Sequence, residues 1–136
     1  MKKKYMHFSQ LVGVLAGVAL VSTVFAQTPY PTKRINFVVG FSAGSSIDLV
    51  ARVVANKLAD KLGQPIVVEN KPGAGGNVAA AYVAHSAADG YTLLVVANSI
   101  AISPALYKDL GFNPRKDLTA VSYIGIGPVI LKVNSK

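Results

Sequence analysis

The stretch RINFVVGFSAGSSIDLVARVVANKLADKLG, residues 34–63, decides the fold of this chain. It opens with a short, apolar, β-branched run over residues 34–39, which is typical of a strand buried on both faces of a parallel sheet. Gly40 ends that run. Ser45 or Ser46 then offers a side-chain oxygen that can cap a helix. The stretch therefore predicts a strand, a glycine-rich loop and a helix, in that order.

Within the helix, apolar residues recur at spacings of three and four: Ile47, Val50, Val54, Leu58 and Leu62. This spacing predicts that they form the face that packs on the sheet. Asp48 lies in the first turn, where the helix dipole favours a carboxylate, and Gly63 is a natural C-terminal stop.

The chain beyond residue 63 continues the alternation of strands and helices. Strands are expected at 66–69, 91–96 and 120–126, with a further apolar run at 129–133. A small-residue helix is expected from Asn77 to about His85, and Ser103-Pro104 predicts the start of a short helix that Gly111 closes. This order predicts an α/β fold with an open, mostly parallel sheet and helices on both faces.

The N-terminal residues form a separate, secretory segment. Lys2, Lys3 and Lys4 precede an apolar run of eleven residues, 11–21, and small residues at Val24 and Ala26 predict cleavage before Gln27. A membrane anchor is the alternative, but a span needs about 20 apolar residues. We therefore expect residues 1–26 to be a signal peptide, the mature chain to lie in the periplasm, and no membrane insertion after cleavage.

Composition excludes several classes of function. Without residues 1–26 the chain carries eleven Lys and Arg against six Asp and Glu, spread singly along the sequence. Such a distribution does not favour a nucleic-acid surface, although a mild positive field would favour anionic ligands. There is no Cys, and no cluster of His, Asp or Glu has metal-ligand spacing, so neither a metal nor a cofactor is expected.

In open parallel sheets, ligands bind at the C-terminal ends of the strands, on the loops that lead into helices. Three such loops are expected, at residues 40–46, 70–77 and 97–103. The first two are rich in glycine and lie at helix N-termini, where unpaired N–H groups suit a carboxylate or phosphate. For each loop alone, the glycines can equally serve only to make tight turns. Asp48 can hold the cationic end of a ligand or be purely structural. The candidate ligand-binding residues are Phe41, Ser42, Ala43, Gly44, Ser45, Ser46, Asp48, Gly75, Gly76, Asn77, Asn98 and Ser99.

A serine hydrolase is the enzyme alternative, because residues 40–44 match the G-x-S-x-G nucleophile elbow between a strand and a helix. In a hydrolase, however, the elbow follows several earlier strands, and here it follows the first. A triad also needs a histidine, and His85, near the end of the second predicted helix, is the only one after residue 26. These residues favour binding over catalysis.

The motifs together resemble the Bug proteins, the periplasmic substrate-binding components of tripartite tricarboxylate transporters. The resemblance extends from Tyr30 to about Val133. It rests on residues 39–48, on LGQP at 62–65, on VVENKPGAGGN at 67–77, on DGYTLL at 89–94, on PALY at 104–107, and on Asp117-Leu118.

This resemblance implies a two-lobed clamshell that closes on a small carboxylate and delivers it to membrane subunits of the transporter. Such receptors are roughly twice this length or more. The resemblance therefore implies that residues 27–128 form the first lobe, incomplete, and that residues 129–136 begin the crossover to a second lobe that this truncated chain lacks. We expect weak or no binding by the chain alone.

Overall fold

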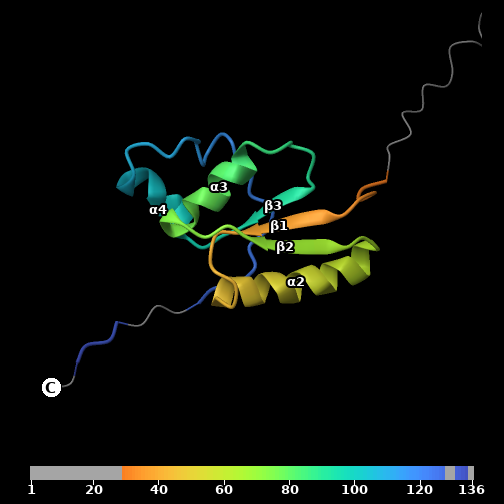
Figure 1. Cartoon of the computed structure of the whole chain (residues 1–136), viewed down its shortest axis with the longest axis horizontal. Helices are drawn as coiled ribbons and strands as arrows, with labels where there is room; N and C mark the ends of the chain where they lie inside the picture. The colour runs from red at the N-terminus through yellow and green to blue at the C-terminus, as the bar shows by residue number, and fades with distance from the viewer. Residues whose placement is uncertain (1–28, 128–130, 135–136) are drawn as a thin grey trace, which may run out of the picture. The chain divides into compact units, whose positions relative to one another are not determined.

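The computed structural model describes residues 29–127 and 131–134; the predicted signal peptide therefore lies outside the described residues, as does the start of the 129–133 run. The regular elements belong to a unit that begins at Pro31. In chain order they are β1 (Ile35–Val39), α2 (Ser46–Leu62), β2 (Ile66–Asn70), the 3₁₀ turn η1 (Ala74–Gly76), α3 (Asn77–Ala84), β3 (Thr92–Val95) and α4 (Ser99–Leu106) (Figure 1).

The three strands form one parallel sheet in the order β2-β1-β3. Val39, the last residue of β1, is in register with Asn70 of β2 and with Val95 of β3. All three strands therefore end at the same edge of the sheet, and the loops that follow them leave from that edge. The predicted open parallel sheet is confirmed.

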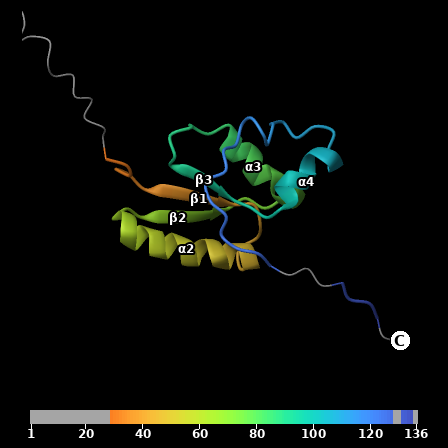
Figure 2. The same cartoon turned by 180° about the vertical axis from the view of Figure 1, so that it is seen from behind.

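Helices cover both faces of this sheet, as the two opposite views show (Figures 1 and 2). Ile35, Phe37 and Val39 alternate along β1 and pack in a buried cluster with Ala51 and Ala55 of α2. Val38 points to the opposite face and is fully buried on the side that α3 covers. The central strand is buried on both sides, as its continuous apolar sequence predicts.

Helix α2 begins and ends where the sequence indicates, but its buried face differs from the prediction. Ser45 caps the helix by accepting a hydrogen bond from the Asp48 N–H, and Gly63 ends it in the left-handed conformation. The prediction was wrong for Val50 and Leu62, which are 44% and 38% exposed. Ile47, Val54 and Leu58 do pack on the core, but the residues buried on α2 are Asp48, Ala51 and Ala55. Two alanines let the helix axis lie close to the sheet, which large side chains would prevent.

The short helix α4 starts earlier than predicted. It begins at Ser99 and runs through Ser103 and Pro104, so the prediction that Ser103 caps a helix reaching Gly111 was wrong. The Ser103 hydroxyl instead donates to the Ser99 carbonyl, 2.9 Å away, one turn back inside the helix. Pro104 is the sixth residue of this eight-residue helix, so it removes one helical hydrogen bond close to the C-terminal end of α4.

The predicted fourth strand is absent from the part of the chain that the structure describes. Residues 120–127 have no regular structure, and Val121, Tyr123 and Ile126 are each more than three-quarters exposed. Residues 131–133, the described part of the last predicted run, are not in a strand either. Strand propensity expresses packing against neighbouring strands, and these segments have no such neighbour in the described residues.

Candidate ligand-binding site

The first two candidate loops touch each other through their backbones. A Cβ atom at Gly40, directly after β1, would lie 2.7 Å from the Cα atom of Gly76 in the second loop. The ring of Phe41 also lies close to Gly76. Because no side chain separates the two backbones, the loop that leads into α2 touches the residue directly before α3 at the C-terminal edge of the sheet.

The third loop joins the second through a side-chain contact. The Ser99 hydroxyl, at the first residue of α4, donates to the Gly75 carbonyl at 2.7 Å. Asn98 lies just before α4 and is exposed, with no side-chain capping bond to the helix. The structure thus brings all three groups of candidate residues to one edge of the sheet.

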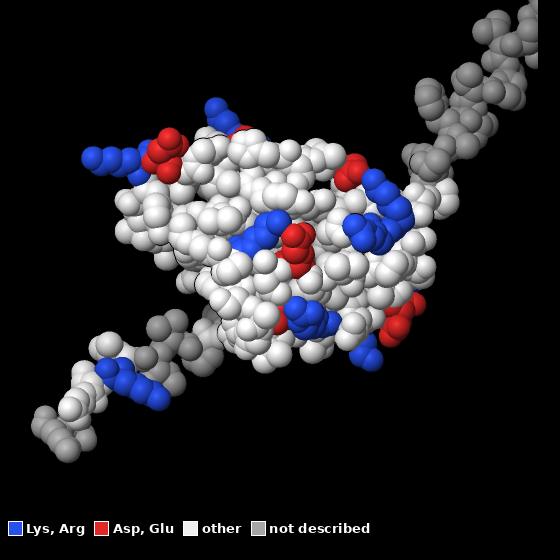
Figure 3. All heavy atoms as spheres, viewed as in Figure 1, with Lys and Arg blue, Asp and Glu red and all other residues white. Residues whose placement is uncertain are grey.

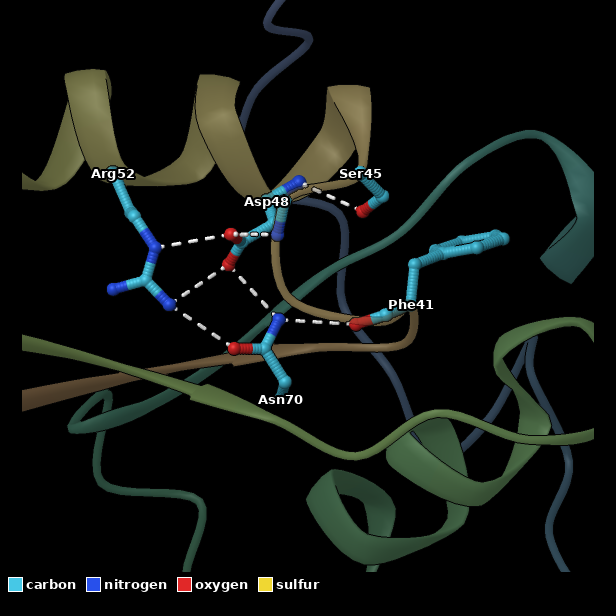
Figure 4. A network of polar contacts seen from close by, with 6 residues as sticks. Phe41, Ser45, Asp48, Arg52 and Asn70 are labelled. Atoms are coloured by element: carbon cyan, nitrogen blue, oxygen red, sulfur yellow. Dashed lines mark hydrogen bonds and ion pairs between the residues drawn. The ribbon is translucent and has the colours of Figure 1, made fainter.

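A network of polar side chains fixes the first loop (Figure 4). Asp48 is 1% exposed, and its carboxylate accepts three hydrogen bonds. The Gly44 N–H (2.8 Å) and the Arg52 Nε (3.0 Å) donate to Oδ2, and the Asn70 Nδ2 (2.9 Å) donates to Oδ1. The Arg52 Nη2 also forms an ion pair with Oδ1 at 3.0 Å. Both oxygens are therefore occupied. Of the two roles open to Asp48, these contacts support the structural one; direct ligand binding by Asp48 stays a prediction.

The electrostatics of the network follow from these donors. Hydrogen bonds from Arg52, then from the Gly44 N–H and then from Asn70, lower the pKa of Asp48 from 3.8 to about 2, against the opposing effect of desolvation. Each donor binds the ionised form more strongly than the neutral one. The first loop therefore contains a buried carboxylate that is already neutralised within the protein and adds little repulsion to an approaching anion.

Backbone donors at the start of α2 remain open. Among the described residues, the N–H groups of Ser46 and Ile47 donate no hydrogen bond, whereas the Ser45 N–H donates to the Ser42 carbonyl. Ser42, Ala43, Gly44 and Ser46 are exposed. Free N–H groups at the positive end of a helix are suitable donors for an anion.

The second loop is built from backbone conformations that favour glycine. Gly73, Gly75 and Gly76 have φ angles of 140°, 65° and 99°, and Ala74 is the non-glycine residue with positive φ among those described, at 46°. The loop leads directly into Asn77, the first residue of α3, which is 6% exposed. Both polar atoms of its side chain are buried, and no protein group in the described part of the chain bonds to them. A buried amide without partners is costly, so it is a plausible contact for a bound molecule or an internal water.

The geometry does not assemble a hydrolase. His85 follows the last residue of α3, and its Nδ1 lies 2.7 Å from the Ala81 carbonyl oxygen, in its own helix. Ser42 lacks the positive φ of a strained turn. In the part of the chain that the structure describes, the G-x-S-x-G match therefore finds no support as a nucleophile elbow.

Charge and metal chemistry add little to the site. Figure 3 shows the Lys and Arg side chains dispersed over the visible face, several of them beside acidic ones. The ion pair Lys71–Glu69 joins near neighbours in the sequence, whereas Lys33–Asp89 joins residues 56 apart, and both lie outside the candidate loop residues. In the described residues there is no group of side chains suited to a metal ion, and no helix there is long and apolar enough to cross a bilayer.

An open groove lies beside the candidate loops. It has a volume of about 2150 Å³ and runs along β3, α4 and residues 107–127. Of the candidate residues, only Ser46 and Asn98 line it. The other candidate residues lie outside this groove.

Sequence reasoning missed three residues of this site: Gly40, Arg52 and Asn70. Gly40 was assigned only the role of ending a strand, and Arg52 only that of a solvent-facing residue. Asn70 could have been predicted as a site residue, because a polar residue at the C-terminal end of a parallel strand lies at the ligand edge of the sheet.

Comparison with known proteins agrees with this geometry. Residues 50–136 match the family model of the tripartite tricarboxylate transporter family receptor. Protein BugT of Bordetella pertussis is 38% identical over 128 residues, which cover 93% of this chain and 39% of BugT. The chain thus spans about two fifths of the length of this curated relative.

Solved structures agree as well. The periplasmic binding protein BugD is 41% identical with a TM-score of 0.62, over 65% of this chain and 29% of BugD. MatC of Rhodopseudomonas palustris, solved with bound malate, is 40% identical with a TM-score of 0.56, over 65% of this chain and 30% of MatC. The predicted resemblance is confirmed: this chain belongs to the tripartite tricarboxylate transporter receptor family.

Proposed function

We propose that this chain is part of a periplasmic solute-binding receptor, which captures a small carboxylate and passes it to the membrane subunits of a tripartite tricarboxylate-type transporter. The observation that carries the proposal is the backbone contact between Gly40 and Gly76, which joins the loop leading into α2 to the residue directly before α3 at one edge of the sheet. Two adjacent helix N-termini can hold an anion without a basic side chain. The malate bound to the relative MatC is a ligand of this class.

The loop residues supply the contacts that a carboxylate needs. The free N–H groups of Ser46 and Ile47 donate from the first loop. The buried Asn77 amide, which has no protein partner in the described residues, can donate from the second. Exposed Ser42 and Ser46 add hydroxyl groups. We propose binding without catalysis, because no general base stands beside any of these hydroxyls in the described residues.

The affinity of these loops alone is expected to be low. They are exposed, and an anion–helix contact at an exposed site contributes about 0.3–1 kcal/mol. Two or three such contacts do not offset the roughly 4 kcal/mol or more that immobilising a ligand costs. We therefore expect this chain to bind dicarboxylates with a dissociation constant in the millimolar range or weaker.

Titration with malate, followed by ¹H–¹⁵N correlation spectra of the purified protein, tests the proposal. Saturable shifts are expected at the amides of 42–47 and 75–77, because the ligand contacts those N–H groups. The amides of Gly63 and Gly111, which lie in turns outside the loops, serve as internal controls and should not move.

Two further controls make the titration decisive. The neutral diamide of malic acid should produce no saturable shifts, and ionic strength is matched with chloride so that screening is constant. Equal shifts from the diamide, or shifts spread over the whole spectrum, would contradict carboxylate recognition by these loops.

A further inference from the structure

Asn70 connects the two candidate loops. It is the last residue of β2, directly before the second loop, and it pairs in register with Val39 at the end of β1. Beside it, the Lys71 N–H donates to the Val39 carbonyl at 2.9 Å. Asn70 therefore has a fixed backbone position at the edge from which both loops leave.

The Asn70 side chain reaches across to the first loop and is fully engaged there (Figure 4). Its Nδ2 donates to the Phe41 carbonyl at 3.0 Å and to the Asp48 Oδ1 at 2.9 Å. Its Oδ1 accepts from the Arg52 Nη2 at 3.1 Å. An amide has two N–H donors, and here both are used.

Together, Asn70 and Asp48 hold the first loop on both sides of its exposed residues. Asn70 binds the Phe41 carbonyl, and Asp48 binds the Gly44 N–H. Between these two points lie Ser42 and Ala43, both exposed. The hydrogen-bond network on β2 and α2 therefore sets the conformation of the first loop, because its exposed residues make few contacts of their own.

We propose that Asn70 is a positioning residue of the ligand site. It fixes the first loop relative to the second, so that the N–H groups at the starts of both helices bind a single ligand. This inference rests on the function proposed above. Its physical basis is preorganisation, because a loop that is ordered before binding does not lose that freedom when the ligand arrives. Asn70 itself contacts no ligand and acts through Phe41, Gly44 and Asp48.

The experiment separates positioning from stability. Asn70→Ala removes the amide, and Leu58→Ala, on the same network-bearing helix but packed in the core, serves as a control that destabilises the fold without touching the loop. For both variants and the parent, the exchange rate of the Gly44 amide is measured without ligand, and the malate dissociation constant is measured by NMR titration.

For Asn70→Ala we expect Gly44 exchange to be about tenfold faster, and malate binding about tenfold weaker, the equivalent of losing one or two net hydrogen bonds. Leu58→Ala should leave malate binding unchanged. The two variants are compared under conditions in which they have the same measured free energy of unfolding. If Asn70→Ala does not fold, Asn70→Ser is used instead; its side chain is uncharged and too short to bond both Phe41 and Asp48, so the same changes are expected.

The outcomes distinguish the two proposals. If Asn70→Ala and Leu58→Ala give the same Gly44 exchange and the same malate affinity, Asn70 has no positioning role. If the parent shows no malate shifts, the proposed function fails, and Gly44 exchange alone then decides whether Asn70 holds the loop.

Discussion

The two glycine-rich loops of this protein look alike in sequence but are held in different ways. Side chains hold the first loop, 40–46, through the buried Asp48 and the amide of Asn70. Backbone geometry holds the second, 71–77, through consecutive residues with positive φ. The comparison shows that one task, the presentation of helix N–H groups, can be met by a polar network or by chain conformation. We therefore expect different substitutions and conditions to disrupt the two loops.

The largest effect is expected where the loops meet, in Gly40→Ala. The new Cβ would lie 2.7 Å from the Gly76 Cα and 3.3 Å from its carbonyl oxygen, so the backbone must move. We expect the free energy of unfolding to fall by about 2–3 kcal/mol, at the upper end for overpacking, because no flexible side chain can yield. Urea denaturation measures this change.

Gly44→Ala is the matched control. Gly44 has a φ of 81°, but no atom lies within 4 Å of the added Cβ. Only backbone strain is therefore expected, about 1 kcal/mol. A loss for Gly44→Ala equal to that for Gly40→Ala would show that the contact between the loops is not tight.

A smaller effect, confined to one loop, is expected from acid. The pKa of Asp48 is about 2 in the folded protein against an ordinary 3.8. The stability that this carboxylate contributes is thus fully present above pH 3.8, and it is lost as the pH falls through about 2. Protonation weakens the network without deleting it, so as the pH falls through about 2 the Gly44 amide resonance should shift and its protection factor against exchange should fall, while Gly76 stays unchanged.

Asp48→Asn controls the acid experiment. The pKa of Asp89 is also lowered, by the Tyr91 N–H and then by Lys33, so acid weakens the protein there as well. In Asp48→Asn the response of Gly44 should disappear and the Asp89 contribution should remain. A Gly44 response that persists in Asp48→Asn would mean that another group controls the first loop.

The smallest effect is expected for Asn77→Ala in the second loop. The Asn77 amide has no protein partner in the described residues, so its removal deletes no such hydrogen bond and relieves a buried polar group. Alanine is also the better helix former. We expect a change within about 1 kcal/mol of zero by urea denaturation, against about 2 kcal/mol lost for Asn70→Ala. Equal losses would show that Asn77 is bonded after all, for example to an internal water.

The sequence predicted β1, β2, β3, α2 and α3 well, because their signals are local. The run 35–39 is apolar and β-branched, and Ser45 and Gly63 mark the ends of α2 through their own conformations. The buried face of α2 was less predictable. Hydrophobicity favoured Val50 over Ala51, whereas the close approach of helix to sheet requires the smaller side chain.

The candidate loops were predicted, but the side chains that hold them were not. The role of Asp48 depends on Asn70, 22 residues further along the chain, and nothing in the spacing indicates that contact. The same holds for segment 120–127, whose strand propensity is realised only beside a partner strand. The local sequence pattern predicts where a helix, strand or loop lies, whereas the contacts with distant residues determine its role.

The strand order β2-β1-β3 also has a consequence for how the chain folds. β1 is first in the sequence but central in the sheet, so it has both neighbours only after Val95 has been made. Such non-local parallel pairing forms slowly. A chain that emerges N-terminus first therefore carries its most apolar strand without its second neighbour through the synthesis of roughly the next fifty-six residues. During that interval it is suited to passage through a narrow channel, and it is also at its most dependent on chaperones.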